Sequence, residues 1–276
     1  MRRRALLLAG LAGLAMPRAV VAQERRLIRQ ADHGGWLGGR RVSFLCVEGT
    51  GEVIHMLEGS DPGARHRPYS TFKIVNAAIA LDTGAASGPE HLRAWDRERH
   101  PPRPHWPGIW QQDHTLDSAF RHSVVWYFEE IAAELGPEVY RERLAQWGYG
   151  NAAAGPGAFW LDGTLEISVA EQIYVLSALS AGALGLSPQA QAALERITRD
   201  GEIAGVPLHG KTGAGPLRGG GLSGPWGGWY VGWMRPPGRL PLTFALYAEA
   251  TTFRALNEFR RAFAVRLLGD ILAGQG

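Results

Sequence analysis

Two lysines stand out among the cationic residues of this 276-residue chain. Lysine and arginine together number 29, and only Lys73 and Lys211 are lysine. Arginine keeps its charge in proteins, whereas a buried lysine can lose its proton and react as an amine. We therefore interpret both lysines as positions where arginine could not serve. The alternative is that two of the 29 cations are lysine here by chance.

Lys73 follows a serine by three positions, in the sequence Ser-Thr-Phe-Lys that opens a predicted helix over 70–84. Residues three apart share one helix face, and a hydroxyl at a helix N-terminus lies near free backbone N–H groups that can stabilise an oxyanion. Apolar neighbours would lower the pKa of Lys73 and leave a base able to take the proton of Ser70. By itself, Ser-x-x-Lys also fits an N-cap serine beside a solvated lysine.

Lys211 lies in a second motif, Lys-Thr-Gly, at the end of a strand-like run. The motif combines a point charge, a hydroxyl and a residue without a side chain. A substrate could lie along this strand edge, its carboxylate held by Lys211 and Thr212 while Gly213 permits close approach. By itself, the motif also fits a turn after a strand.

Strand-like runs lie toward both ends of the chain and helical patterns lie between them. The predicted strands are 42–47, 53–57, 206–209, 229–234 and 242–248, and the further predicted helices are 117–135, 138–147, 169–179, 188–199 and 256–272. This order predicts an α+β fold, with a central antiparallel five-stranded sheet flanked by terminal helices and a separate helical lobe. The cleft between sheet edge and lobe is a favoured place for a ligand.

The first 22 residues read as a secretory signal peptide. Three arginines precede an apolar stretch of 12 residues, and small residues precede Gln23. A twin-arginine export route is an alternative to general secretion. We expect a periplasmic or secreted protein without a stable membrane anchor. The predicted units are the signal peptide, 1–22, and a single catalytic domain, 23–276, with an α/β lobe at 23–85 and 200–276 and a helical lobe at 86–199.

Composition argues against several classes of partner and cofactor. The net charge of +3 includes four arginines of the leader, which has no acid, so the remainder carries 3 − 4 = −1 and does not indicate a nucleic-acid partner. One cysteine excludes an internal disulfide and a cysteine-rich zinc module. The nine histidines form no His-Glu-x-x-His, so we expect no metal.

Five motifs in order resemble those of the class D (oxacillinase-type) serine β-lactamases. They are Ser-Thr-Phe-Lys (70–73), Ser-Val-Val (123–125), Tyr-Gly-Asn (149–151), Phe-Trp-Leu (159–161) and Lys-Thr-Gly (211–213). The resemblance extends from about Val42 to the last helix. Five ordered motifs are far more specific than the Ser-x-x-Lys that penicillin-binding proteins share.

The resemblance implies that Ser70 attacks the carbonyl of a β-lactam antibiotic and forms an acyl-enzyme that water then cleaves. It also implies that Lys73 adds CO2, supplied by bicarbonate, as N6-carboxylysine, which is the general base for both steps. Trp160 would donate its indole N–H to the carbamate. Only a neutral amine adds CO2, so an apolar pocket would favour the modification, here formed by Phe72, Val125 and Leu161.

Further roles follow from the same resemblance. Ser123 would relay a proton to the leaving nitrogen, with Lys211 as a fixed positive charge nearby. The backbone N–H groups of Ser70 and Ala214 would form the oxyanion hole. Members of the family often have an aromatic residue at the position of Ala214, so this departure leaves the substrate range open.

Arg260 is the best match to the family arginine that binds the substrate carboxylate through two hydrogen bonds, with Arg254 and Arg261 as nearby alternatives. Such an enzyme would confer β-lactam resistance.

Two other functions are alternatives to a β-lactamase. A transpeptidase or carboxypeptidase would form the same acyl-enzyme without hydrolysing it, but would lack the context of motifs 149–151 and 159–161. A sensor that binds β-lactam would need membrane-spanning segments, and none follows the leader.

Overall fold

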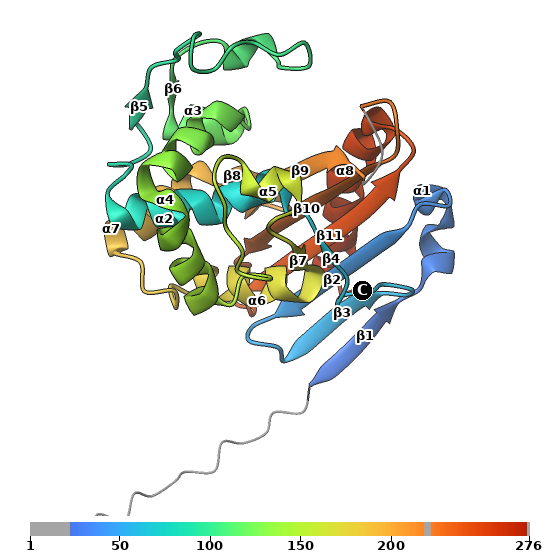
Figure 1. The fold of residues 1–276 in the computed structure, drawn as a ribbon. Helices are drawn as coiled ribbons and strands as arrows, with labels where there is room; N and C mark the ends of the chain where they lie inside the picture. The colour runs from blue at the N-terminus through green and yellow to red at the C-terminus, as the bar shows by residue number, and fades with distance from the viewer. Residues whose placement is uncertain (1–22, 218–221, 275–276) are drawn as a thin grey trace, which may run out of the picture.

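A computed structural model describes residues 23–217 and 222–274, and the predicted signal peptide lies outside these described residues. Within them, seven strands form one sheet in the order β1-β3-β2-β11-β10-β9-β8 (Figure 1). The strands are β1 (Glu24–Ile28), β2 (Val42–Glu48), β3 (Val53–Leu57), β8 (Arg199–Ile203), β9 (Val206–Pro216), β10 (Trp226–Met234) and β11 (Leu242–Ala250). Strands from both ends of the chain thus meet at the β2–β11 pair, as the sequence predicts.

The predicted α+β fold class is confirmed, but the predicted sheet was wrong in two respects. It has seven strands rather than five, and it is mixed, because β1 runs parallel to β3. The two additional strands, β1 and β8, lie at the edges and read Glu-Arg-Arg-Leu-Ile and Arg-Asp-Gly-Glu-Ile. Edge strands tolerate exposed charged residues, so neither shows the apolar run that identifies a buried strand.

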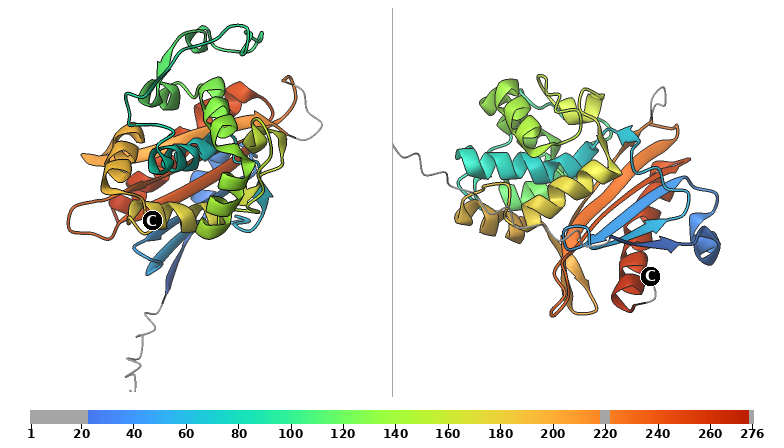
Figure 2. Two further views of the ribbon diagram at one scale, coloured as in Figure 1. Left: turned by 60° about the vertical axis from the view of Figure 1, so that its left-hand side comes forward. Right: turned by 90° about the horizontal axis from the view of Figure 1, so that it is seen from below.

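Helices cover both faces of the sheet (Figure 2). On one face α8 packs against β10 and β11, and on the other α6 packs against β2 and β11. The helices are α1 (Gly34–Leu37), α2 (Lys73–Thr83), α3 (Leu116–Arg121), α4 (Val125–Trp147), α5 (Phe159–Asp162), α6 (Val169–Ser180), α7 (Pro188–Ile197) and α8 (Phe253–Leu272), with 3-10 turns at η1 (Gln30–His33), η2 (Tyr69–Phe72) and η3 (Gly108–Trp110). No helix among the described residues has both the length and the apolar character needed to cross a membrane.

The middle of the chain packs on the sheet rather than apart from it. One buried cluster joins sheet residues such as Val231 and Ala245 to residues of α2, α4 and α6. Short pairings β4 (Arg65–His66) with β7 (Ile167–Ser168) and β5 (Leu92–Arg93) with β6 (His114–Thr115) tie the loops together. The division into two lobes at 85 and 200 stays a prediction.

Two predicted helices have different bounds in the structure. The predicted helix over 117–135 is two helices, because Ser123, at φ 58°, forms the turn between α3 and α4. The helix predicted to open at Ser70 begins as the 3-10 turn η2, and α2 starts at Lys73. The predicted break near position 137 is present as a non-helical Gly136 inside α4, just before Pro137.

Candidate active site

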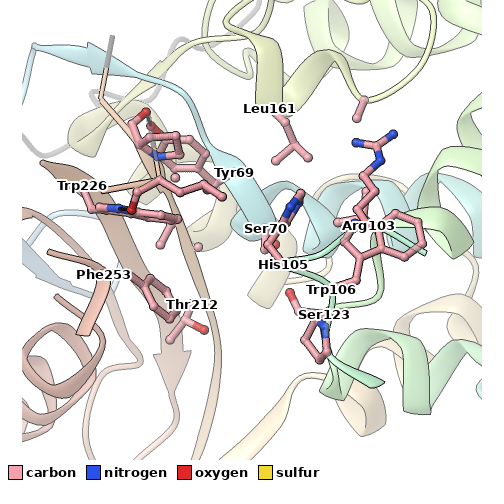
Figure 3. Close-up of a pocket in the computed structure, with 18 of the residues that line it drawn as sticks. Tyr69, Ser70, Arg103, His105, Trp106, Ser123, Leu161, Thr212, Trp226 and Phe253 are labelled. Carbon is pink, nitrogen blue, oxygen red and sulfur yellow. Dashed lines mark hydrogen bonds between the residues drawn. The ribbon is translucent and has the colours of Figure 1, made fainter. Parts of the chain in front are cut away.

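A cleft with a volume of about 860 Å³ lies between η2, β9, the α3–α4 turn and α8 (Figure 3). This volume suits a small-molecule ligand. Most of the residues that the sequence predicts for the site line it, namely Ser70, Ser123, Val125, Leu161, Thr212, Gly213, Ala214 and Arg260. Residues that are far apart in the sequence therefore meet in one place.

Ser70 and Lys73 face each other across one turn, because η2 continues directly into α2. The Lys73 Nζ donates to Ser70 Oγ at 3.0 Å. Tyr69, just before the serine, has φ 49°, a conformation that a bulky L-residue adopts rarely. The turn is braced by Thr71, whose hydroxyl donates to Pro68 O at 2.6 Å and accepts from Gln172 at 3.1 Å.

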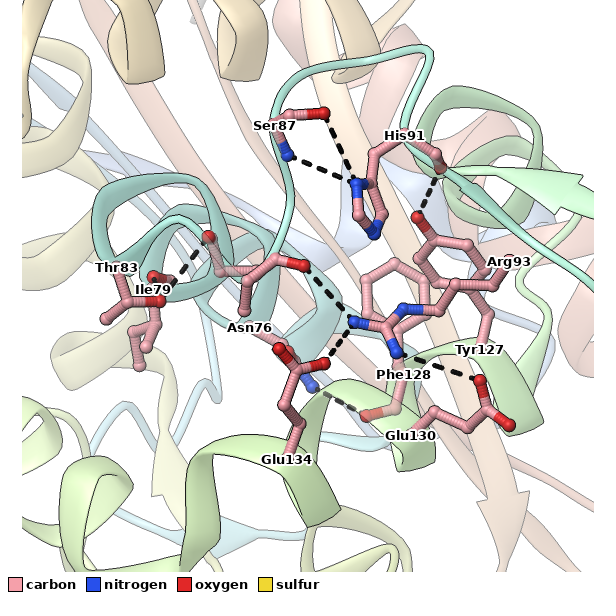
Figure 4. A network of polar contacts seen from close by, with 12 residues as sticks. Asn76, Ile79, Thr83, Ser87, His91, Arg93, Tyr127, Phe128, Glu130 and Glu134 are labelled. Carbon is pink, nitrogen blue, oxygen red and sulfur yellow. Dashed lines mark hydrogen bonds and ion pairs between the residues drawn. The ribbon is translucent and has the colours of Figure 1, made fainter.

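The amine of Lys73 is completely buried. Burial and the nearby charge of Lys211 hold the pKa of Lys73 well below its usual value, and Glu129 opposes them only in part. The ring of Phe128 lies 5.4 Å from Nζ. Asn76 of α2 donates to the backbone carbonyl of Phe128 on α4 at 3.4 Å, within a polar network that links the two helices (Figure 4). This setting favours the neutral form of the amine.

Lys211, Thr212 and Gly213 lie in the middle of β9 rather than at the strand end that the sequence predicts. Their strand runs beside η2. A Cβ placed on Gly213 would lie 2.8 Å from Pro68 O and 3.0 Å from Ser70 N. Gly213 is thus required by the backbone of the nucleophile turn, whereas the sequence analysis assigned its small size to the approach of a substrate.

Lys211 is buried beside the ring of Phe120, 5.7 Å from Nζ. Burial, and then the charge of Arg260, lowers the pKa of Lys211 to about 8, while Asp200 opposes this effect. Lys211 and Arg260 are thus two buried cations, and the charge of Lys211 in turn disfavours a charge on Lys73. An anionic ligand would relieve the repulsion between Lys211 and Arg260, so the site favours a ligand of that charge.

Arg260 differs from the two arginines considered beside it. It is 95% buried, since its exposed fraction is 5%, and its Nε and Nη1 have no hydrogen-bond partner among the described residues. Burial lowers the pKa of Arg260 to about 10. Arg254 instead pairs with Glu258 at 2.9 Å on the surface, and Arg261 with Asp200 at 2.8 Å. Unpaired donors in a cleft wall are suited to a carboxylate.

Trp160 is fully buried in α5, and its indole N–H has no partner among the described residues. Its ring stacks on Phe72 with centroids 5.4 Å apart, which places the indole beside the residue that precedes Lys73. Val125 and Leu161 line the cleft, as the sequence analysis expected. Phe72 does not line it, because its ring packs in this aromatic core. The aromatic ring that lies over the Lys73 amine is Phe128, whose role the sequence analysis missed.

The sequence analysis also missed the aromatic walls of the cleft. Trp226 and Phe253 lie on one side of Ser70, and Trp106 lies on the other (Figure 3). No short sequence pattern marks these residues, because they come from three separate segments. In the described ranges, no group of three or more histidine, cysteine or acidic residues could hold a metal ion.

Comparisons with known proteins agree with this geometry. The sequence model of the penicillin binding protein transpeptidase domain matches residues 64–252. β-Lactamase OXA-20 of Pseudomonas aeruginosa is 35% identical over 218 residues, which cover 76% of this chain and 74% of that protein. The structure of FUS-1 (OXA-85), a class D β-lactamase from Fusobacterium nucleatum subsp. polymorphum, is 26% identical with a TM-score of 0.76, and the match covers 87% of this chain and 96% of that one.

The C-terminal domain of the Bacillus licheniformis BlaR penicillin-receptor has the same fold, with a TM-score of 0.78 over 92% of this chain and 98% of that one. Its 22% identity extends the likeness no further than the fold. The match to OXA-20, in contrast, exceeds 30% identity over most of both chains. On this evidence the protein belongs to the class D β-lactamases.

Proposed function

We propose that this protein is a serine β-lactamase that hydrolyses the β-lactam amide through an acyl-enzyme on Ser70. The observation that carries the proposal is the 3.0 Å hydrogen bond between Ser70 Oγ and the buried amine of Lys73. A hydroxyl is a weak nucleophile until a base takes its proton, and a buried lysine with a lowered pKa is suited to that task. Penicillins and related β-lactam antibiotics are the substrates, and resistance to them is the expected phenotype.

Two features support the carboxylation of Lys73. The amine is buried in an apolar setting, and only its neutral form can add CO2, losing a proton as the carbamate forms. The buried, unpartnered N–H of Trp160 is a donor in need of an acceptor. Bound CO2 would supply a carboxylate-like base at the end of the Lys73 side chain. Trp160 would then hold that group in place with its N–H.

In acylation, the Ser70 hydroxyl loses its proton toward Lys73, and its oxygen bonds to the lactam carbonyl carbon. The ring C–N bond breaks, and the nitrogen takes a proton through Ser123, with Lys211 as a fixed charge nearby. The backbone N–H groups of Ser70 and Ala214 stabilise the oxyanion. Water then loses a proton at the Lys73 end and bonds to the ester carbon, the bond from that carbon to Ser70 Oγ breaks, and Ser70 Oγ takes the proton back as the product acid leaves. Thr212 and Arg260 hold the substrate carboxylate, which the unpaired Arg260 donors support.

A time course of intact-protein mass spectrometry with benzylpenicillin tests the proposal. We expect a transient adduct of one penicillin, with its loss matched by the appearance of hydrolysed product. The Ser70→Ala variant, which has no hydroxyl, is the control and should show no adduct. A stable adduct without product would indicate a transpeptidase or a receptor instead, and the absence of any adduct in the wild type would reject a covalent mechanism.

The Trp160→Phe substitution should slow deacylation by about 10- to 100-fold, and acylation by less, because it removes one hydrogen bond to a charged group. Added bicarbonate should restore part of the rate by mass action. Trp147→Phe is the matched control, because Trp147 is another buried indole whose N–H has no partner among the described residues. Pre-steady-state kinetics separates the two steps, and an unchanged acyl-enzyme lifetime in Trp160→Phe would contradict the role.

Activity should depend on bicarbonate most strongly in mildly acidic buffer. Because Lys73 adds CO2 only as the neutral amine, protonation of that amine as the pH falls through its lowered pKa favours loss of the carbamate. We expect degassed enzyme to lose activity there, and bicarbonate to restore it, with little effect at alkaline pH. A 13C NMR signal after addition of labelled bicarbonate provides a readout independent of activity. Equal activity with and without CO2 at both pH values would reject the carbamate.

We also propose that the protein acts in the periplasm or outside the cell, delivered there by the 22-residue leader. The cell wall, where β-lactams act, lies in the same compartment. Cell fractionation of a host that expresses the full chain tests this proposal, with the N-terminal sequence of the mature protein as the readout. A protein retained in the cytoplasm with Met1 intact would contradict it.

A further inference from the structure

One wall of the cleft is built by the segment between β5 and β6, residues 94–113. The segment rises beside α3 at the edge of the molecule (Figure 1). Arg103, His105, Trp106 and Trp110 of this segment line the cleft, across from Trp226 and Phe253 (Figure 3). The five class D motifs include no residue of this wall.

Side chains anchor the wall to the body of the protein. His100 Nε2 lies 3.1 Å from Glu130 on α4, and the Trp126 indole donates to Trp110 O at 2.7 Å. The Trp110 indole in turn donates to His122 O, next to Ser123, at 2.9 Å. These bonds place the wall in a fixed position relative to the α3–α4 turn. A side chain that it presents to the cleft is therefore positioned before a substrate arrives.

Arg103 is the cation that this wall presents. Proline on both sides, Pro102 and Pro104, restricts the backbone around it. Its guanidinium carbon lies over the buried ring of Trp106, 5.5 Å from the centroid, which is a cation–π contact. Within the described chain, no carboxylate lies within ion-pair distance of Arg103, although most other arginines there have one.

Two acidic residues, Glu129 and Asp162, line the same cleft. Asp162 accepts a hydrogen bond from Thr164 N at 2.7 Å. Glu129 lies close enough to Lys73 to raise its pKa against the effect of burial. Neither forms an ion pair with Arg103 in the described residues. An anion beside Arg103 would therefore meet an uncompensated positive charge.

The position of Arg103 relative to the nucleophile indicates which part of a substrate it meets. Ser70 lies between the α8 side of the cleft, with Phe253 and Trp226, and the wall with Arg103 (Figure 3). In a penicillin, the ring carboxylate and the acylamino side chain lie at opposite ends, with the reactive carbonyl between them. With the carboxylate held by Arg260 on α8, the acylamino side chain extends toward Arg103.

From this geometry we propose that Arg103 binds an anionic group on the acylamino side chain, so that the enzyme favours β-lactams whose side chain carries a carboxylate. The inference rests on the proposed β-lactamase function and adds a substrate class to it. Arg103 contacts the side chain and takes no part in the chemistry. Because Arg103 is exposed to solvent, its effect depends on salt concentration.

Two penicillins that differ in one group test this proposal. Benzylpenicillin and α-carboxybenzylpenicillin share every atom of the ring system and differ by the side-chain carboxylate. The readout is the ratio of kcat/KM for the carboxylated compound to that for benzylpenicillin. We expect Arg103→Gln to lower this ratio about three- to fivefold at low salt, the upper range for an exposed ion pair, and Arg103→Lys to lower it less, because charge is retained. High salt should lower the ratio in the wild type and in Arg103→Lys, but not in Arg103→Gln.

Arg97→Gln is the matched control, because Arg97 lies in the same segment, is exposed, and does not line the cleft. It removes the same charge and should leave the ratio unchanged. The proposal would be overturned if the kcat/KM ratio fell equally in Arg97→Gln, or if it stayed unchanged in Arg103→Gln. If the wild type hydrolyses neither compound, the β-lactamase function itself fails, which is a separate result from an altered ratio.

Discussion

Replacing Lys73 with methionine lowers kcat for penicillin hydrolysis by about three to four orders of magnitude, the expected cost of removing a general base. Methionine has nearly the length of lysine and fills the same buried space, but it has no amine to take the proton of Ser70. Lys73→Arg should be as inactive, because guanidinium stays protonated and cannot add CO2. Stopped-flow hydrolysis of a chromogenic β-lactam measures both variants.

Stability separates loss of chemistry from loss of fold in these variants. No carboxylate lies within ion-pair distance of the Lys73 amine among the described residues, and its hydrogen bond is to Ser70. Replacing a buried, poorly compensated polar group by an apolar one of similar shape is often neutral or stabilising. We therefore expect the free energy of unfolding of Lys73→Met to stay level or to rise by about 1–2 kcal/mol. Near-native turnover in either variant would reject Lys73 as the base.

The Arg260→Gln substitution lowers kcat/KM for penicillins by about 100-fold, because it removes a buried, charge-assisted pair with the ring carboxylate. The same substitution should have little effect on a penicillin methyl ester, which has no carboxylate to bind. Comparing wild type and Arg260→Gln on the penicillin and on its methyl ester thus gives a thermodynamic cycle, which isolates the interaction between Arg260 and the substrate carboxylate. Steady-state kinetics with both substrates provides the measurement.

Arg254→Gln and Arg261→Gln are matched controls for Arg260. Each removes one arginine charge from the same helix, and each of these arginines has an acidic partner at the surface. We expect both to retain kcat/KM within about twofold, as exposed ion pairs contribute little. If either control loses more activity than Arg260→Gln, the carboxylate is bound by that arginine instead.

How far the sequence predicts this molecule depends on whether a feature is local. Ser70 and Lys73 are three residues apart, and the structure brings their side chains together as helix geometry requires. Lys211 was placed at a strand end because the strand-like run ends at residue 209, and Gly210 and Gly213 lie beyond it. In the structure they lie within β9, where small residues are required because other groups pack directly against the strand.

Features that arise only from tertiary contact could not be predicted. The edge strands β1 and β8 are formed by charged residues that pair with a neighbour already in the sheet. The ring of Phe128 reaches Lys73 from α4, 55 positions along the chain, through a crossing of two helices. Burial distinguishes Arg260 from its neighbours Arg254 and Arg261. This burial is known only from the structure, in which the face of α8 that carries Arg260 packs inward.

The contact between Gly213 and the backbone of residues 68–71 has a consequence for how this enzyme can adapt. No Cβ fits between Gly213 and this backbone, so β9 and the turn that carries Ser70 form one rigid unit. Few substitutions at this contact, which we call the seam, would preserve the unit. The surrounding segments, such as 94–113, can vary without displacing the nucleophile. New antibiotic preferences are therefore expected to evolve through changes in those segments, while the seam itself stays as it is.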